Sequence, residues 1–270
     1  MANNLGVIGT GVMGSAIVNS LLKANFKGKI TASDTRQERV EAMQALGIAA
    51  TSDNKKAAAA SDIIFVTVKP GEEEKVLREM ENELEDKLVL SVAATVPLSF
   101  LKKTVPKARF VRIMPNIAAL VQAAYTAYSC DSDTTEEDKM VVKELLNMMG
   151  VSEEIDEKYM DAITGLSGSA PGYLSIIVEA LMYAGLRAGL PRRIALKSAA
   201  QSVLGTGKLI VELEEEPAKI RDMVTTPGGT TIAAIYELEG SQIRQALMRA
   251  VEEATKKAQL IREKIGIENS

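Results

Sequence analysis

Short apolar runs alternate with amphipathic stretches along the first half of the chain. Runs typical of buried strands occur at residues 5–8, 29–33, 63–68, 88–93, 110–114 and 125–129. Patterns with a helical period lie between or after them, at residues 14–22, 40–46, 72–80 and 135–148. Strands that alternate with helices are typical of a parallel sheet with crossover helices. We therefore expect an α/β N-terminal domain with a mainly parallel sheet.

The chain changes character after about residue 160. Long helical patterns follow, with few strand signals, at residues 173–189, 194–213 and 242–261. The first two are apolar almost all round, and a helix of that kind must be covered on more than one side. We expect residues 161–270 to form an all-α domain that builds a homodimer. A monomeric bundle covered by the N-terminal domain is the alternative.

The first predicted strand leads into a glycine-rich turn of the form G-x-G-x-x-G. Its residues are Gly9, Thr10, Gly11, Val12, Met13 and Gly14. The first glycine makes a tight turn, the second lets a pyrophosphate approach the backbone, and the third allows close packing of helix on strand. The phosphates would lie at the N-terminus of the following helix. Residues 1–160 are therefore predicted to be a Rossmann-like domain that binds NADPH or NADH.

Asp34 follows the second predicted strand, where an acidic residue accepts hydrogen bonds from the adenosine ribose. A carboxylate there repels a 2′-phosphate and favours NADH, whereas Arg36 could pair with that phosphate. The choice of cofactor stays open, with a slight preference for NADH on charge. Lys69 ends another buried strand, at the edge of the sheet where ligands bind, and is equally well explained as a solvated loop lysine.

Composition narrows the chemistry that this chain can perform. The 270 residues carry a net charge of -4 without a basic run, which argues against nucleic acid. The absence of histidine excludes a Ser-His-Asp triad, a Cys-His pair and histidine-containing zinc sites, so we expect no metal. Cys130 is the only cysteine and cannot form an internal disulfide. With no signal-peptide pattern and no apolar run of about 18 residues, we expect a cytoplasmic protein without a membrane span.

A second glycine-containing loop lies at residues 224–232, with the sequence V-T-T-P-G-G-T-T-I. A tight loop before a helix leaves backbone N–H groups free, an arrangement that suits a carboxylate. An ordinary helix start capped by Thr230 or Thr231 explains the same residues equally well.

Four segments, in this order, resemble motifs of the pyrroline-5-carboxylate reductase family. Residues 68–70 match its V-K-P, and residues 114–121 its M-P-N-T-P-A-L-V. Residues 166–173 resemble L-S-G-S-G-P-A-Y, and residues 222–232 resemble D-x-V-T-S-P-G-G-T-T-I. The chain departs from these patterns at Ile117 and Ala118, at Ala170 and Gly172, and at Thr95, where the family has glycine.

The resemblance implies an enzyme that reduces 1-pyrroline-5-carboxylate to L-proline with NADPH or NADH. It assigns the hydrogen bond to the substrate nitrogen to Thr231, and substrate binding to Gly228, Gly229, Thr230 and Asn116. It assigns cofactor contacts to Asn54, Val68, Lys69, Pro70, Ala93 and Ala94. The family forms dimers that exchange C-terminal helices, and these can assemble into decamers.

Two other hypotheses remain. A related imine reductase or β-hydroxyacid dehydrogenase can share the glycine-rich start. The dehydrogenases are expected to carry a lysine followed four residues later by asparagine, but Lys197 is followed at that spacing by Gln201. A non-catalytic NAD(P)-binding regulator of the same fold is the other hypothesis, and it would bind cofactor without turnover.

Overall fold

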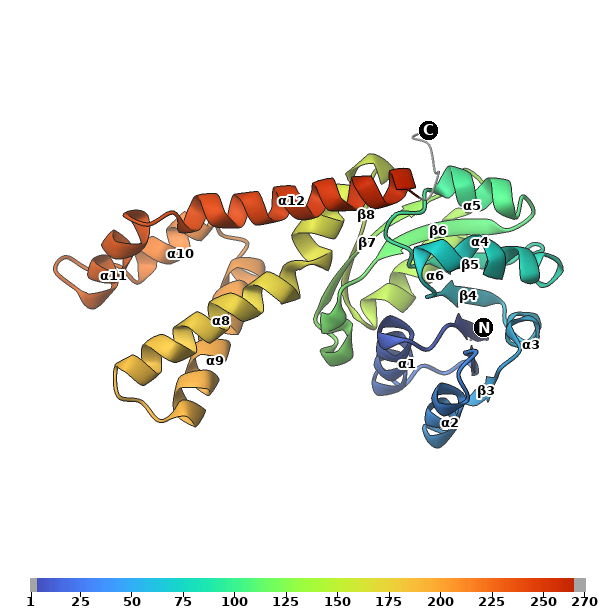
Figure 1. Cartoon of the computed structure of the whole chain (residues 1–270), viewed down its shortest axis with the longest axis horizontal. Coiled ribbons are helices and arrows are strands. Elements are labelled where there is room, and N and C mark those ends of the chain that lie inside the picture. The colour runs from blue at the N-terminus through green and yellow to red at the C-terminus, as the bar shows by residue number, and fades with distance from the viewer. Residues whose placement is uncertain (1–3, 265–270) are drawn as a thin grey trace. The chain divides into compact units, whose positions relative to one another are not determined.

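The computed structural model describes residues 4–264 and divides into two compact units (Figure 1). The first unit contains the chain up to Ser169 together with the residues from Glu252 onward, and the second unit runs from Ala170 to Val251. Each unit is described by itself.

An eight-stranded sheet forms the centre of the first unit, in the order β3-β2-β1-β4-β5-β6-β7-β8. All neighbouring strands are parallel except β6 and β7, so the expected mainly parallel sheet is confirmed. The strands are β1 Leu5–Ile8, β2 Ile30–Ser33, β3 Ala49–Thr51, β4 Ile63–Val66, β5 Leu88–Ser91, β6 Arg109–Met114, β7 Ala124–Cys130 and β8 Gly150–Glu154.

Helices connect the strands of this sheet. They are α1 Val12–Lys23, α2 Gln37–Ala45, α3 Asn54–Ala59, α4 Pro70–Glu79, α5 Leu98–Thr104, α6 Glu136–Asn147 and α7 Met160–Ile163. Short turns of helix η1 Glu81–Leu84, η2 Ile117–Val121, η3 Glu157–Tyr159 and η4 Thr164–Gly168 complete the unit.

Apolar residues fill both faces of the sheet. Neighbouring strand residues alternate between the faces: Val7 belongs to a core cluster that includes side chains of α1, α2 and α6, and Ile8 to one that includes side chains of α3, α4 and α5. Strands buried on both sides have continuous apolar sequences, which is why β1, β4 and β5 were predictable. The loops that follow β1 and β4 therefore emerge from the buried central part of the sheet.

The second unit is helical, as expected. It contains α8 Ala170–Arg187, α9 Arg192–Leu213, α10 Pro217–Met223, α11 Thr230–Glu239 and the first part of α12 Ile243–Lys264. Helices α8 and α9 pack as a hairpin around the turn at Gly189, whose φ is +90°. At Gly185 an added Cβ would lie 2.8 Å from the Cβ of Ala195, so this close approach requires glycine.

Large apolar side chains of the second unit lie exposed in the single chain. Ile176 on α8, Leu204 on α9 and Tyr236 on α11 are 65%, 59% and 78% exposed. Exposed apolar surface of this extent is typical of an interface with another protein molecule. The sequence predicted helices that need cover on more than one side, and within one chain that cover is missing in the described residues.

One helical stretch in the described part of the chain, residues 157–187, is long and apolar enough to cross a membrane, a test that concerns length and composition alone. No such span was expected from the sequence. A single stretch of this kind is weak evidence, because apolar helices of soluble proteins pass the same test.

Candidate active site

The glycine-rich turn has the geometry that a pyrophosphate requires. Gly9 has a φ of +90°, and a Cβ at Gly14 would lie 2.0 Å from the Gly9 carbonyl oxygen, so neither position accepts a side chain without rearrangement. Helix α1 begins after Gly11, and no side chain caps it. Its first N–H groups are therefore available to an anion.

A cavity of about 680 Å³ opens beside this turn. It lies where β1, β2 and β4 end, which is the edge at which parallel sheets bind ligands. Predicted cofactor residues that line it are Gly9, Gly11, Val12, Asp34, Arg36, Asn54, Val68 and Lys69. Residues that the sequence analysis did not single out also line it: Thr35, Arg39, Thr67, Glu72, Lys75, Val76 and Glu79.

The carboxylate of Asp34 is buried at the end of β2 and is fully engaged. It accepts hydrogen bonds from the backbone N–H of Thr10 at 2.9 Å and from the Thr10 hydroxyl at 3.2 Å. The backbone N–H and Nε of Arg36 donate to its other oxygen, at 3.0 and 3.3 Å. Burial disfavours the charged form, but these hydrogen bonds outweigh burial and lower the pKa of Asp34.

Arg39 is the main residue of this cavity that sequence reasoning missed. Its Nη1 lies 3.8 Å from Asp34 Oδ2, and it lies 3.0 Å from the position that a Cβ on Gly11 would occupy. The same nitrogen is buried and makes no hydrogen bond within the described residues. Arg39 lies on α2 in a charged stretch. Its contact with the glycine turn arises from the fold, so no pattern in the sequence predicts it.

Hydrogen bonds fix the side chains of two further lining residues, Asn54 and Thr67. Asn54 Oδ1 accepts from Ser33 Oγ at 2.8 Å, and its Nδ2 donates to Glu79 at 3.3 Å. The Thr67 hydroxyl donates to the carbonyls of Ile8 and Gly9, and thereby fixes the glycine turn to the end of β4.

Other predicted cofactor residues do not line the cavity. Met13 packs against the core, and Pro70 is the first residue of α4. Ala93 is buried, and the Ala94 carbonyl accepts a hydrogen bond from Arg112 Nη2 at 2.5 Å. The walls of the cavity come instead from the glycine turn and from the residues that follow β2 and β4.

Asn116 follows β6, and the polar atoms of its side chain make hydrogen bonds within the first unit. Its Oδ1 accepts from the backbone N–H of Ala118 at 3.1 Å and so caps η2. Its Nδ2 donates to the carbonyl and the hydroxyl oxygen of Ser167, both at 3.2 Å. In this state Asn116 orders two segments of backbone.

The second glycine-containing loop belongs to the second unit and connects α10 to α11. Gly228 has a φ of +69°, and a Cβ on Gly229 would lie 2.5 Å from Thr226 Oγ1. Helix α11 begins after Gly229 and has no side-chain cap. The alternative in which Thr230 or Thr231 caps the helix is therefore wrong, because Gly229 is the N-cap and Thr230 is already the first helical residue, and no side chain caps the first N–H groups.

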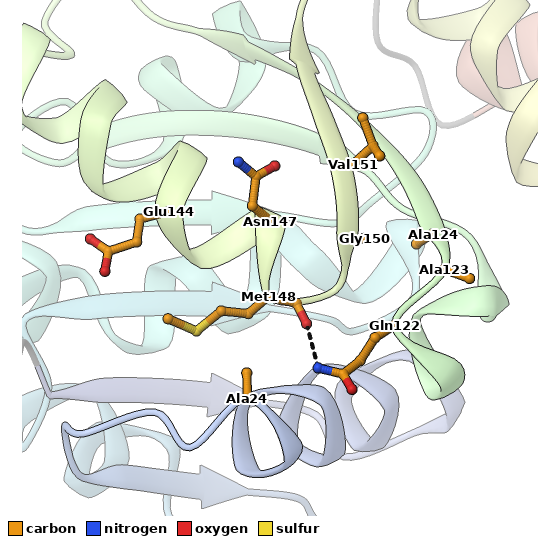
Figure 2. Close-up of a pocket in the computed structure, with 9 residues that line it drawn as sticks. All are labelled: Ala24, Gln122, Ala123, Ala124, Glu144, Asn147, Met148, Gly150 and Val151. Atoms are coloured by element: carbon orange, nitrogen blue, oxygen red, sulfur yellow. Dashed lines mark hydrogen bonds between the residues drawn. The ribbon is translucent and has the colours of Figure 1, made fainter. Parts of the chain in front are cut away.

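A second cavity, of about 700 Å³, lies elsewhere in the first unit (Figure 2). Gln122 Nε2 donates to the Met148 carbonyl at 3.2 Å on its wall. Ala24 and Met148, the C-terminal caps of α1 and α6, line this cavity. Helix C-termini repel anions, so the cavity beside the glycine turn is the better fit for a dinucleotide.

The described residues give little support to catalysis by a cysteine nucleophile or by a metal ion. Burial first, and then the nearby charge of Glu154, raise the pKa of the Cys130 thiol to about 12, so this thiol is a poor nucleophile. The part of the chain that the structure describes contains no group of three His, Cys, Asp or Glu side chains that could hold a metal ion.

Two family descriptions match the chain. "NADP oxidoreductase coenzyme F420-dependent" matches residues 4–95, and "Pyrroline-5-carboxylate reductase dimerisation" matches residues 157–261. The first covers the cofactor cavity, and the second covers the apolar helices.

Curated relatives and solved structures agree with these matches. Pyrroline-5-carboxylate reductase of Methanosarcina acetivorans is 39% identical over 94% of this chain and 96% of its own length. The Escherichia coli reductase is 37% identical over 96% and 98%. The Plasmodium falciparum reductase with NADP bound superposes with a TM-score of 0.87 at 28% identity, covering 96% of this chain and 98% of the other.

The cavity, its glycine cradle and these matches together establish the class of protein. It is an NAD(P)H-dependent oxidoreductase that acts on a C=N bond, and its dimerisation region indicates a homo-oligomer. This chain belongs to the pyrroline-5-carboxylate reductase family.

Proposed function

We propose that this chain reduces 1-pyrroline-5-carboxylate to L-proline, the last step of proline biosynthesis. The observation that carries the proposal is that named reductases match 94% or more of the chain, so the cofactor half and the helical half are both shared. The imine carbon receives a hydride, and the nitrogen carries a proton in the product.

The nicotinamide of the cofactor supplies the hydride when it is bound. Residues of this chain bind and orient the cofactor. The uncapped N-terminus of α1 receives the pyrophosphate, with Gly11 allowing the close approach. The segment of Val68 to Pro70, together with Ala93 and Ala94, frames the nicotinamide end.

Both forms of the cofactor suit the adenosine end of the cavity. Asp34 lines this end of the cavity, where the sequence suggested a contact with the ribose that favours NADH. However, its charge is offset by Arg36 and by the nearby Arg39, whose Nη1 lacks a hydrogen bond within the described residues. Two guanidinium groups at this position favour a 2′-phosphate, and we therefore propose that NADPH is the preferred cofactor.

We assign substrate binding to the loop before α11. The backbone N–H groups of Gly228, Gly229 and Thr230 would hold the substrate carboxylate, because the uncapped helix start favours an anion. The Thr231 hydroxyl would hydrogen-bond the ring nitrogen, and a hydroxyl can act there as donor or acceptor.

This chemistry requires no imidazole, in keeping with a chain that contains no histidine. A cyclic imine can already carry a proton on nitrogen near neutral pH, so its carbon accepts hydride without an acid residue beside it. The protein mainly contributes orientation, which can lower a barrier by up to about 7–11 kcal/mol.

We further propose that residues 1–160 serve cofactor binding and that residues 161–270 form a homodimer through the C-terminal helices. Exposed apolar side chains on α8, α9 and α11 support this interface. Assembly of dimers into a decamer and a cytoplasmic location complete the proposal.

The test is oxidation of the cofactor with 1-pyrroline-5-carboxylate, followed by absorbance with NADPH and with NADH in parallel. Turnover with formation of L-proline supports the proposal, and the ratio of kcat/KM values reports cofactor preference. Binding of both cofactors without oxidation would contradict it and would instead favour a regulatory role.

A further inference from the structure

A carboxyl group lies inside the core beside residues 91–94, the segment that is proposed to frame the nicotinamide. Glu73 belongs to the first turns of α4, and its side chain is 0% exposed. Its neighbours differ, because Glu72 lines the cofactor cavity and Glu74 pairs with Arg78 at the surface. A buried acid of this kind needs a physical explanation, since ionised carboxyl groups are costly to bury.

A short chain of hydrogen bonds joins Glu73 to the backbone after β5. The Ala93 N–H donates to Ser91 Oγ at 3.3 Å, and Ser91 Oγ donates to Glu73 Oε1 at 2.5 Å. The other carboxyl oxygen, Oε2, is buried and has no partner in the described residues. Glu73 therefore contacts, through one hydroxyl, the segment of residues 91–94 that is proposed to frame the nicotinamide.

Arg112 links the same segment to a set of charges that is already balanced. It lies opposite Ser91 in the sheet, and its Nη2 donates to the Ala94 carbonyl at 2.5 Å. Its Nη1 pairs with Glu157 at 3.0 Å, and Asp161, 3.9 Å from Nη2, pairs with Arg262 at 3.0 Å. Two arginines thus face two carboxylates, and an ionised Glu73 would add an unbalanced negative charge.

The protonation of Glu73 follows from this environment. Burial raises its pKa to about 7, while the Ser91 hydroxyl and the positive charge of Arg112 act in the opposite direction and are weaker. Helices α3 and α5 also pack against α4. Among the described residues, Arg112 on β6 is the charged group that acts on the pKa of Glu73. No charged group on α3 or α5 contributes to it.

We propose that neutral Glu73 is a positioning residue for hydride transfer, which fixes residues 91–94 through Ser91 and leaves Arg112 on the Ala94 carbonyl. Once ionised, Glu73 competes for Arg112, and the Ala94 carbonyl loses its donor. The reaction then slows although the cofactor still binds at its phosphates. This inference rests on the proposed function for its catalytic readout.

The test compares kcat as a function of pH for the wild type, Glu73→Gln and Glu74→Gln. Glutamine imitates the neutral acid in shape, and the surface residue Glu74 provides a matched control on the same helix. We expect kcat of the wild type and of Glu74→Gln to fall about tenfold between pH 6 and pH 8, as the neutral fraction falls. Glu73→Gln should lack the part of this fall that ionisation of residue 73 causes.

The substrate's own ionisation affects all three proteins alike, so the difference between the two variants isolates Glu73. The KM for NADPH should change less than twofold with pH in each protein, because the phosphate contacts do not depend on Glu73. Identical pH profiles for Glu73→Gln and Glu74→Gln would overturn the proposal. So would a Glu73→Gln enzyme that is slow at every pH while the wild type becomes faster as pH rises.

The thermal midpoint as a function of pH separates this inference from the proposed function. If none of the proteins turns over, the reaction assignment fails, but the midpoint of the wild type should still fall relative to that of Glu73→Gln as pH rises from about 4.5 to about 7. Parallel midpoint curves would show that folding does not raise the pKa of Glu73, and would overturn the inference independently.

Discussion

At the scale of single residues, the cofactor cavity is defined by how charges are paired. Asp34 alone would repel a 2′-phosphate, but its carboxylate already accepts hydrogen bonds from Thr10 and Arg36. Arg39 adds a guanidinium beside the glycine turn. The charge at this end of the cavity therefore depends on three side chains together, which no single position in the sequence reveals.

Replacement of Arg39 tests this reading of cofactor preference. Arg39→Ala should raise the KM for NADPH about tenfold or more, because a charge-assisted hydrogen bond to the phosphate is worth roughly 1.5–3 kcal/mol. The KM for NADH should stay within about twofold of the wild type. Steady-state kinetics with both cofactors makes the measurement, and Arg78→Ala on the surface of α4 is the control. Equal losses with the two cofactors would mean that Arg39 does not recognise the 2′-phosphate.

The buried position of Glu73 predicts that pH affects the stability of the protein as well as its rate. Its pKa rises from 4.5 to about 7 on folding, so the native state binds more protons than the unfolded state between these values. Stability therefore falls as pH rises from about 4.5 to about 7, by on the order of 3 kcal/mol, and stays lower above pH 7. Urea unfolding at pH 5 and pH 8, at one protein concentration, should show this loss in the wild type relative to Glu73→Gln. An equal pH dependence in both proteins would contradict it.

The sequence identified part of this residue-scale picture. Gly9, Gly11 and Asp34 were predictable because the dinucleotide motif has a fixed spacing along the chain. Arg39 and Glu73 were not, because their roles arise from contacts across the fold: Arg39 reaches over the turn before α1, and Glu73 meets Ser91 from a neighbouring strand. A run of three glutamates at residues 72–74 gives no sign of which one is buried.

At the scale of elements, several of the described helices begin without a side-chain cap, and two of these begin after a glycine. Helix α1 starts after Gly11 and α11 after Gly229. By contrast, α6 has a capping box made by Thr135 and Asp138. A helix start with a glycine at the N-cap has neither a capping side chain nor a Cβ to obstruct a ligand, which is consistent with pyrophosphate at α1 and carboxylate at α11.

Thr231 lies in the first turn of α11, and its replacement tests the proposed substrate site. Thr231→Ala should retain fold and cofactor affinity but lower kcat roughly 10- to 100-fold, the effect of losing one hydrogen bond to a charged group. Thr231→Ser keeps the hydroxyl and should recover most of the rate. The comparison needs kcat for the three proteins together with fluorescence titration of NADPH. If Thr231→Ala turns over as fast as the wild type, Thr231 has no part in the reaction.

The elements missed by sequence analysis are the short and exposed ones. Strand β3 has three residues at the edge of the sheet, and β8 at the other edge has the largely polar sequence G-V-S-E-E. Neither carries the continuous apolar run that identified β1, β4 and β5, because an edge strand is not covered on all sides. Helices α3 and α5, of six and seven residues, are too short for a periodic pattern.

At the scale of the whole molecule, the described part of the second unit buries few apolar side chains within one chain, among them Met182, Ala195 and Ile220. Side chains such as Ile176 and Leu204 are exposed, although the helices that carry them are apolar. The dimerisation match over residues 157–261 indicates a homo-oligomer. Under the proposed function, another copy covers this surface.

A charge placed on that surface should disrupt the assembly. Leu204→Glu should shift the protein towards monomers at micromolar concentration and lower its thermal midpoint. Met140→Glu is the matched control, because Met140 is 67% exposed on α6 of the first unit and Leu204 is 59% exposed. Sedimentation velocity and a thermal melt measure both effects. If the two variants sediment alike, the helical surface around Leu204 is not the interface.

The most direct test of the central claim follows the hydride itself. The protein is incubated with 1-pyrroline-5-carboxylate and NADPH in which deuterium replaces the hydrogen of nicotinamide C4 that is transferred. The proline is then analysed by mass spectrometry. We predict L-proline that contains one deuterium atom. Absence of labelled proline, with the cofactor bound and unoxidised, would contradict the assignment of this chain as a reductase of the cyclic imine.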